Sequence, residues 1–84
     1  YFVLPLLRRG KLVGRLDAKA HRKEGVFEVK SLYLEPGVRV TASLAQDLEK
    51  ALQKLAQWHQ TPLLRLGAMP APLRALWPES APLP

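Results

Sequence analysis

Residues 14–25 read Gly-Arg-Leu-Asp-Ala-Lys-Ala-His-Arg-Lys-Glu-Gly and form the most densely charged stretch of this 84-residue chain. An apolar run, 1–7, and a short segment that starts at Lys11 precede it, and a second apolar run, 26–34, follows it. Glycines bound the stretch, and glycine suits turns with unusual backbone angles. We therefore expect two strands, of which the second runs to Asp17, then a basic loop that ends at Gly25, and a third strand.

The run that precedes this stretch, 1–7, is apolar at every position. Such a run predicts a strand that is covered on both faces or that faces another domain. Pro5 lacks a backbone N–H, which places the strand at a sheet edge or at a bulge. Residues 8–11 then read as a tight turn, in which we expect Gly10 to adopt a positive φ angle.

The next two strands show alternating apolar and polar positions. Leu12 and Leu16 alternate with Arg15, so we expect the leucines on the core face and Arg15 on the face toward solvent. In the third strand, 26–34, the alternation breaks at Ser31, which predicts a β-bulge there. The residues assigned to the core face of this strand are Phe27, Val29 and Tyr33.

A helix is predicted for the leucine-rich region that follows the turn at 35–37. Thr41 or Ser43 can cap this helix, and Ser43 with Gln46 fits a capping box. The apolar stripe consists of Leu44, Leu48, Ala51, Leu52, Leu55 and His59. Leucines contribute roughly 1.5–3 kcal/mol each when fully buried, so we expect this stripe to pack across the sheet. The helix ends before Thr61-Pro62.

The remaining residues add a short fourth strand at 63–66, which Gly67 ends, and one or two turns of helix at 72–77. These elements predict an α+β domain over 1–77. We expect a barrel-like, curved antiparallel sheet of three main strands plus a short fourth, with one long helix packed across it. Residues 78–84 read as a proline-rich tail.

Composition excludes several classes of protein. The chain has no cysteine, so a disulfide framework and a thiolate metal site are excluded. No apolar run approaches the roughly 20 residues of a membrane span, and no secretory signal is recognisable. Because the chain opens on Tyr1 without a methionine, we expect a fragment of a longer protein, and the expected location of that protein is the cytoplasm.

The formal charge of +6 is concentrated in the first half of the chain. Residues 1–39 carry nine Lys or Arg against four Asp or Glu, whereas residues 40–84 carry four against three. A basic surface favours polyanions, and without a basic amphipathic membrane helix we expect nucleic acid rather than a membrane as the partner. The candidate phosphate-binding residues are Arg15, Lys19, Arg22 and Lys23, with Arg8, Arg9 and Lys11 as auxiliary cations. The alternative is a solvated basic loop without a partner.

No catalytic constellation is recognisable in the sequence. His21 and His59 are the only histidines, and we expect His59, at the end of the helix stripe, to have a core or capping role. There is no phosphate-binding glycine loop and no serine nucleophile elbow. Trp58 and Trp77 are expected in the core or at a domain interface rather than as stacking platforms for bases. We therefore expect no catalysis, no cofactor and no metal in this chain on its own.

Three segments carry a family resemblance: 4–7 (Leu-Pro-Leu-Leu), 11–25 (Lys-Leu-Val followed by the stretch quoted above) and 32–38 (Leu-Tyr-Leu-Glu-Pro-Gly-Val). They look like the C-terminal region of the YcaQ-like winged-helix DNA glycosylases. In that family a Leu-Pro segment and a hairpin lead to Gly-Arg-x-Asp-x-Lys-x-x-Arg-Lys, and a strand then closes at Glu-Pro-Gly. The resemblance covers roughly residues 1–60, with Ala18 and His21 where the family has Pro and Asp.

The resemblance implies an enzyme that excises alkylated bases and interstrand crosslinks from DNA, built from tandem winged helices and a small barrel-like C-terminal domain. The Gln-centred catalytic motif of the family lies in the winged-helix part, and no segment here matches it. This chain would then be the accessory, DNA-backbone-facing domain, with the upstream winged-helix domains of the same chain as its partners. The alternatives are a domain-docking module, supported by the apolar first strand and Trp77, and a small RNA-binding domain.

Overall fold

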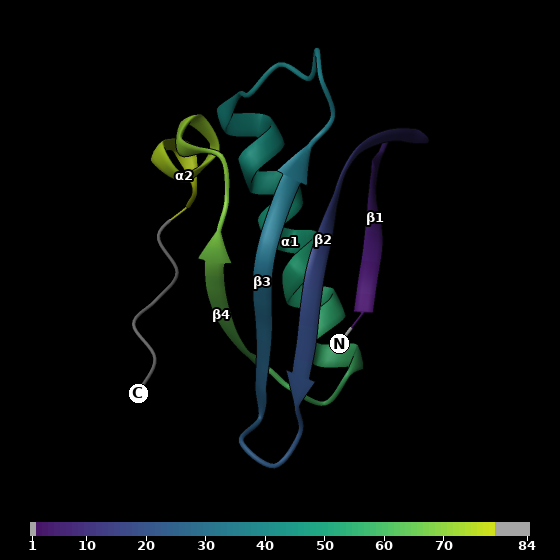
Figure 1. The fold of residues 1–84 in the computed structure, drawn as a ribbon, viewed down its shortest axis with the longest axis vertical. Helices are drawn as coiled ribbons and strands as arrows, with labels where there is room; N and C mark the ends of the chain where they lie inside the picture. Colours follow the sequence, from purple (N-terminus) through teal and green to yellow (C-terminus); the bar gives the residue numbers. More distant parts are fainter. Residues whose placement is uncertain (1, 79–84) are drawn as a thin grey trace.

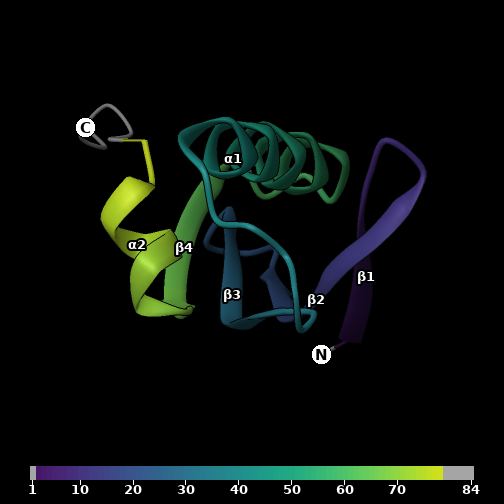
Figure 2. The same cartoon turned by 90° about the horizontal axis from the view of Figure 1, so that it is seen from above.

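The computed structural model describes residues 2–78 of the chain. Within them, the elements run in the order β1 (Phe2–Arg8), β2 (Lys11–His21), β3 (Val26–Leu34), α1 (Ala42–Trp58), β4 (Leu63–Ala68) and α2 (Ala71–Leu76) (Figure 1). The strands form one sheet in the order β1-β2-β3-β4, and this sheet curves around α1 (Figure 2). We call the face turned away from α1 the open face. Of the expected tail, 78–84, all but Pro78 lies outside the described residues.

The predicted α+β class is confirmed, and β1, β2 and β3 pair antiparallel as expected. β4, however, runs parallel to β3, which makes the sheet mixed. Parallel neighbours need a crossover connection, and α1 with its flanking loops provides it. β1 and β4 are the two edges of an open sheet, so the expected barrel-like closure does not form.

The basic loop expected after Asp17 is shorter than predicted, because β2 continues to His21. Only 22–25 form a turn. Ala18 is fully buried whereas the neighbouring Lys19 is exposed, which is the alternation of a strand with one face on the core. The charged side chains of the stretch therefore project from a strand in a fixed direction.

A β-bulge near the start of β2 changes which of its residues reach the core. The pairing of β1 with β2 shifts between Leu6 and Leu7, and Val13 is left out of the register. Val13 is consequently buried, whereas Leu12, expected in the core, is 50% exposed. The prediction for Leu16 and Arg15 is confirmed, since Leu16 is fully buried and Arg15 is exposed.

A second bulge lies in β3, near Ser31, as predicted. The pairing of β2 with β3 passes from Ser31 to Val29 and omits Lys30. Because the extra residue reverses the alternation, Tyr33 does not share the core face with Phe27, as the uninterrupted pattern suggested. Tyr33 is instead 42% exposed on the open face.

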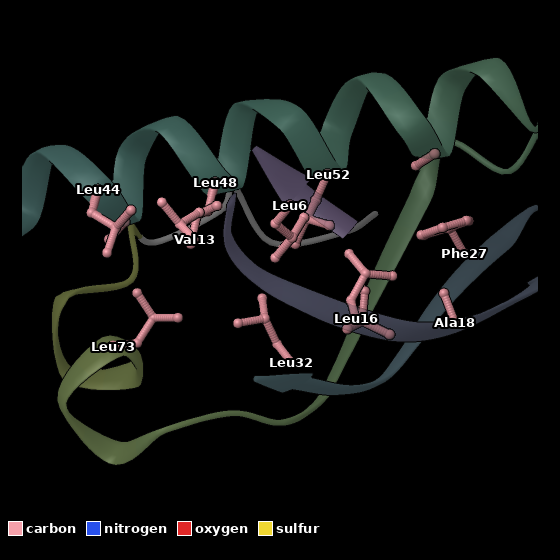
Figure 3. Packing of buried hydrophobic residues seen from close by; sticks show 13 residues of the cluster. Leu6, Val13, Leu16, Ala18, Phe27, Leu32, Leu44, Leu48, Leu52 and Leu73 are labelled. Atoms are coloured by element: carbon pink, nitrogen blue, oxygen red, sulfur yellow. The ribbon is translucent and has the colours of Figure 1, made fainter. Parts of the chain in front are cut away.

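The hydrophobic core lies between α1 and the sheet (Figure 3). Thr41 caps α1, since its Oγ1 accepts a hydrogen bond from the Leu44 N–H at 3.0 Å. Ser43, the other candidate cap, accepts a hydrogen bond from Arg8 instead, so the expected box with Gln46 is not the cap. The buried cluster consists of Leu6, Val13, Leu16, Ala18, Phe27, Val29, Leu32, Leu44, Ala45, Leu48, Leu52, Ala56 and Leu73.

α2 confirms the expected short helix and returns the chain to the core. Its Leu73 is fully buried and lies in the same cluster as the leucines of α1 (Figure 3). No helix within residues 2–78 is long and apolar enough to cross a membrane.

Candidate nucleic-acid interface

Arg15 and Tyr33 oppose each other on the open face of β2 and β3. They are direct partners in the strand register, and Cζ of Arg15 lies 4.4 Å from the centroid of the Tyr33 ring. A guanidinium at this distance is attracted by the quadrupole of the ring, which orders the side chain and leaves its N–H groups available to an acceptor. The sequence placed Arg15 on this face but missed the ring beneath it, because the bulge in β3 turned Tyr33 outward.

A hollow of about 240 Å³ lies beside this pair on the open face. Its walls include Val3, which is 58% exposed, and Leu12. At Gly14 a Cβ atom would run into the carbonyl oxygen of Tyr33, so the missing side chain lets the two strands come together. Among the described residues, the lining consists of Val3, Pro5, Leu12, Gly14, Arg15, Tyr33, Leu34 and Glu35.

Lys19 lies on the same face of β2, four residues beyond Arg15. At about 3.3 Å per residue the two positions are about 13 Å apart along the strand. Lys19 is opposite Glu28 in the register, and Glu28 is opposite Arg65 of β4. Among the residues that the structure describes, no carboxylate forms an ion pair with Lys19. Its ammonium group is therefore open to solvent or to an anionic ligand.

Glu28 contacts two basic side chains in this region. Nε2 of His21 lies 2.8 Å from Oε1 of Glu28, and Nζ of Lys30 lies 3.4 Å from its Oε2. The hydrogen bond from His21, together with the charge of Lys30, holds the pKa of Glu28 below its ordinary value. Glu28 is therefore ionised at neutral pH, and it offsets part of the positive charge at this end of the open face.

Arg22 and Lys23 lie in the turn that joins β2 to β3. Gly25 closes this turn at a φ of 70°, and its N–H donates a hydrogen bond to the carbonyl of Arg22 at 3.2 Å. Both cations are exposed, and neither forms an ion pair with a described residue. The structure therefore places Arg15 and Lys19 on β2, and Arg22 and Lys23 in the turn at the end of that strand.

The auxiliary cations lie at the opposite end of the sheet and differ in what they contact. Nε of Arg8 lies 2.7 Å from Oδ2 of Asp47, and its Nη2 donates to Oγ of Ser43 at 2.6 Å. The hydrogen bond from Arg8 holds the pKa of Asp47 below its ordinary value. Arg9 and Lys11 are exposed in and after the turn, with Arg9 at a φ of 53°. Arg8 is thus engaged within the fold, whereas the other two remain available.

The aromatic residues at the ends of the helices have three different surroundings. His59 caps the C-terminus of α1 and stacks on Phe2 and Phe27 at centroid distances of 5.2 and 5.5 Å, which confirms its core and capping role. Trp58 is 77% exposed, so the core position considered for it is wrong and the domain-interface position stays a prediction. Trp77 packs against the core, and its buried Nε1 has no hydrogen-bond partner among residues 2–78.

The chemistry that this surface offers is the binding of anions. Guanidinium and ammonium groups donate charge-assisted hydrogen bonds to phosphate oxygens, and Arg15 adds a planar group suited to stacking. Within residues 2–78 no three His, Cys, Asp or Glu side chains are placed to hold a metal ion.

The fold and the surface define a small α+β domain with a cationic open face. The chain belongs to the AlkZ-like family of DNA glycosylases, since residues 2–58 match the family described as DNA glycosylase AlkZ-like. This match confirms the resemblance to the YcaQ-like enzymes, and it makes the chain a domain of a DNA-repair protein. The matched segment spans β1 to α1, and β4 and α2 follow it. No solved structure matches the chain.

Proposed function

We propose that this chain is the accessory, DNA-backbone-facing domain of a DNA-repair glycosylase of the cytoplasm. The observation that carries the proposal is the row of cations along β2, in which Arg15 and Lys19 share the open face while Arg22 and Lys23 occupy the turn beyond it. Contacts of such groups with phosphates position a protein on DNA without reading its sequence.

The excision chemistry is assigned to another part of the protein. A glycosylase extrudes its target nucleotide into a pocket before it cuts the bond to the base. In this proposal the upstream winged-helix domains perform that step on alkylated or crosslinked bases, while the cations of β2 hold the flanking backbone. The family membership supports a role on DNA, and the side chains that line the open face support contact with phosphates.

The salt dependence of duplex binding tests this role. Three or four phosphate contacts release counterions and give a slope of log affinity against log salt of about −3, with dissociation constants of about 10⁻⁴ to 10⁻⁶ M. Replacing Arg15, Lys19 and Arg22 together with Ser should flatten the slope and weaken binding equally for all DNA sequences. Because these side chains are exposed, the melting temperature should fall by no more than the few degrees that correspond to losing the contact of Arg15 with Tyr33.

A matched control variant loses the same number of positive charges at positions away from the open face. Arg39, Lys50 and Lys54 are exposed and lie on α1 or the loop before it, so their triple Ser variant loses three positive charges away from the open face. We expect this control to keep the steep slope. Equal losses in both triple variants, or a parent chain that does not bind DNA in low salt, would contradict the backbone-facing role.

The second candidate is a domain-docking module, which one observation favours. The open face exposes Leu7, Leu12 and Tyr33 by 63%, 50% and 42%, and exposed apolar side chains that lie together are typical of contact surfaces. In this alternative the cations are merely solvated, and the parent chain shows no salt-dependent affinity for DNA. The same titration therefore separates the two candidates.

A further inference from the structure

The hollow beside Arg15 and Tyr33 has no part in the backbone-facing role, in which only the cations contact DNA. At about 240 Å³ it is smaller than the roughly 300–1,000 Å³ of sites for drug-sized ligands. A single planar ring system is a suitable occupant for a space of this size. The hollow lies on the same face as Lys19, about 13 Å along β2 from Arg15.

The Arg15–Tyr33 pair supplies the kind of wall on which a nucleobase stacks. Unpaired bases stack on aromatic rings and on guanidinium planes, and this stacking is largely independent of base identity. Here the guanidinium is held over the ring, with Cζ 4.4 Å from its centroid. Because the two residues are direct cross-strand partners, the sheet itself fixes the pair.

The other residues that line the hollow can contact the two faces and the edge of a base. Val3, Pro5 and Leu12 give apolar walls that can exclude water from the faces of a ring. Glu35 lies at the hollow beside Leu34, and its carboxylate is an acceptor for the N–H groups that a base carries on its edge. The cations beyond Arg15 are placed for the phosphates on the same strand of DNA.

We propose that this hollow takes one unpaired DNA nucleobase, stacked against the Arg15–Tyr33 pair, while the cations along β2 hold the phosphates of the same strand. The proposal rests on the proposed function and deepens it, because it names the form of DNA that the domain favours. A fully paired duplex engages only the cations. DNA with an unpaired nucleotide engages the hollow as well and binds more tightly.

The test compares two probes: a DNA duplex, and the same duplex with one unpaired 2-aminopurine. Stacking of a base on an aromatic side chain changes affinity by about tenfold or more. We expect the full chain to bind the probe with the unpaired base about tenfold more tightly, with quenching of its fluorescence. Tyr33→Ala should abolish both effects, whereas Tyr33→Phe should retain them because the ring remains.

Two control variants locate the effect. Leu7 lies outside the lining of the hollow and is 63% exposed, so Leu7→Ala should keep the preference for the unpaired base. Trp58 is the other strongly exposed aromatic among the described residues, and Trp58→Ala should keep it too. A thermal melt of each variant establishes that it is folded. A loss of preference in Trp58→Ala but not in Tyr33→Ala would overturn the assignment of the base to this hollow.

The remaining outcomes separate this proposal from the backbone-facing role. If the parent binds duplex with a steep salt slope but shows no preference for the unpaired base, the hollow is not a base site and the backbone role stands. If the parent binds neither probe, both proposals fail. Tighter binding of an RNA strand than of DNA would overturn the assignment to DNA. Self-association in sedimentation that both Leu7→Ala and Tyr33→Ala abolish would make the face a protein interface and overturn the proposal.

Discussion

Nε of Arg8 lies 2.7 Å from Oδ2 of Asp47, and this ion pair joins the end of β1 to the first half of α1. The two residues are 39 positions apart in the sequence. The same guanidinium donates to Ser43 one helical turn earlier, so it contacts two successive turns of α1. Arg8 therefore links an edge strand to the helix, and its guanidinium is already paired with a carboxylate of the same chain.

Acidification tests this contact. The hydrogen bond from Arg8 lowers the pKa of Asp47, so its contribution to stability is present above the ordinary aspartate pKa and is lost as the pH falls through the folded-state pKa. We expect Asp47→Asn to lower the melting temperature at neutral pH, and we expect this gap to close as the pH falls through the folded-state pKa of Asp47, because the parent then loses the charge too. Melts of both proteins across this range measure the gap. A gap that stays constant down to the lowest pH would contradict the ion pair.

Truncation of the helix stripe tests the core. Leu48 and Leu52 are almost completely buried, so Leu48→Ala or Leu52→Ala should each cost about 2–5 kcal/mol of unfolding free energy, because each leaves a cavity in a small core. Leu76→Ala is the control, since Leu76 is 42% exposed and should change stability by less than about 0.5 kcal/mol. Urea unfolding gives the three values. Unchanged stability in both core variants would rule out the packing of α1 on the sheet.

The close approach of β2 and β3 at Gly14 gives a third prediction. A Cβ at this position meets the backbone of Tyr33 rather than a movable side chain, so Gly14→Ala should cost about 1–3 kcal/mol. Gly10 is the comparison, because it has a φ of 79° and a Cβ added there would meet nothing within 4 Å, and Asn tolerates this backbone region. Gly10→Asn should therefore be close to neutral in the same unfolding experiment. Equal stability of Gly14→Ala and the parent would show that the strands can separate without cost.

The assignment of the excision chemistry to another domain predicts an inactive chain. Incubated with DNA that contains an alkylated base, the purified chain should produce no abasic sites above a protein-free blank. Alkaline cleavage of end-labelled DNA counts such sites. Release that persists through successive purification steps in proportion to the protein would place catalysis in this chain and overturn the accessory role.

Much of the fold follows from local sequence patterns. The stripe of α1 and the turn at Gly10 are both present as expected, because helical spacing and glycine backbone freedom act over a few residues. The last part of β2, from Ala18 to His21, was expected as loop, although Ala18-Lys19-Ala20-His21 alternates in polarity. The high density of charged residues favoured a loop in the prediction, and alanine is a weak signal for a buried strand.

Other features depend on contacts that are distant in sequence. The leucines at 63–66 indicate a strand but carry no information on its direction, so the parallel pairing of β4 with β3 was not predictable. The position of Tyr33 depends on where the bulge falls, and one residue of shift moves a side chain to the other face. The alternation of β2 was enough to place Arg15 on the face toward solvent, whereas the position of Lys19 on the same strand, and the engagement of Arg8 by Asp47, required the fold.

The parallel pairing of β4 also protects the neighbouring strand from other chains. β4 covers β3 from Val26 to Ser31, a segment rich in β-branched and aromatic residues. Without β4, the N–H and C=O groups along that side of β3 would be unpaired and would offer a template for edge-to-edge aggregation. Residues 63–68 lie beyond the segment that matches the family, yet they cover one side of a strand that belongs to it.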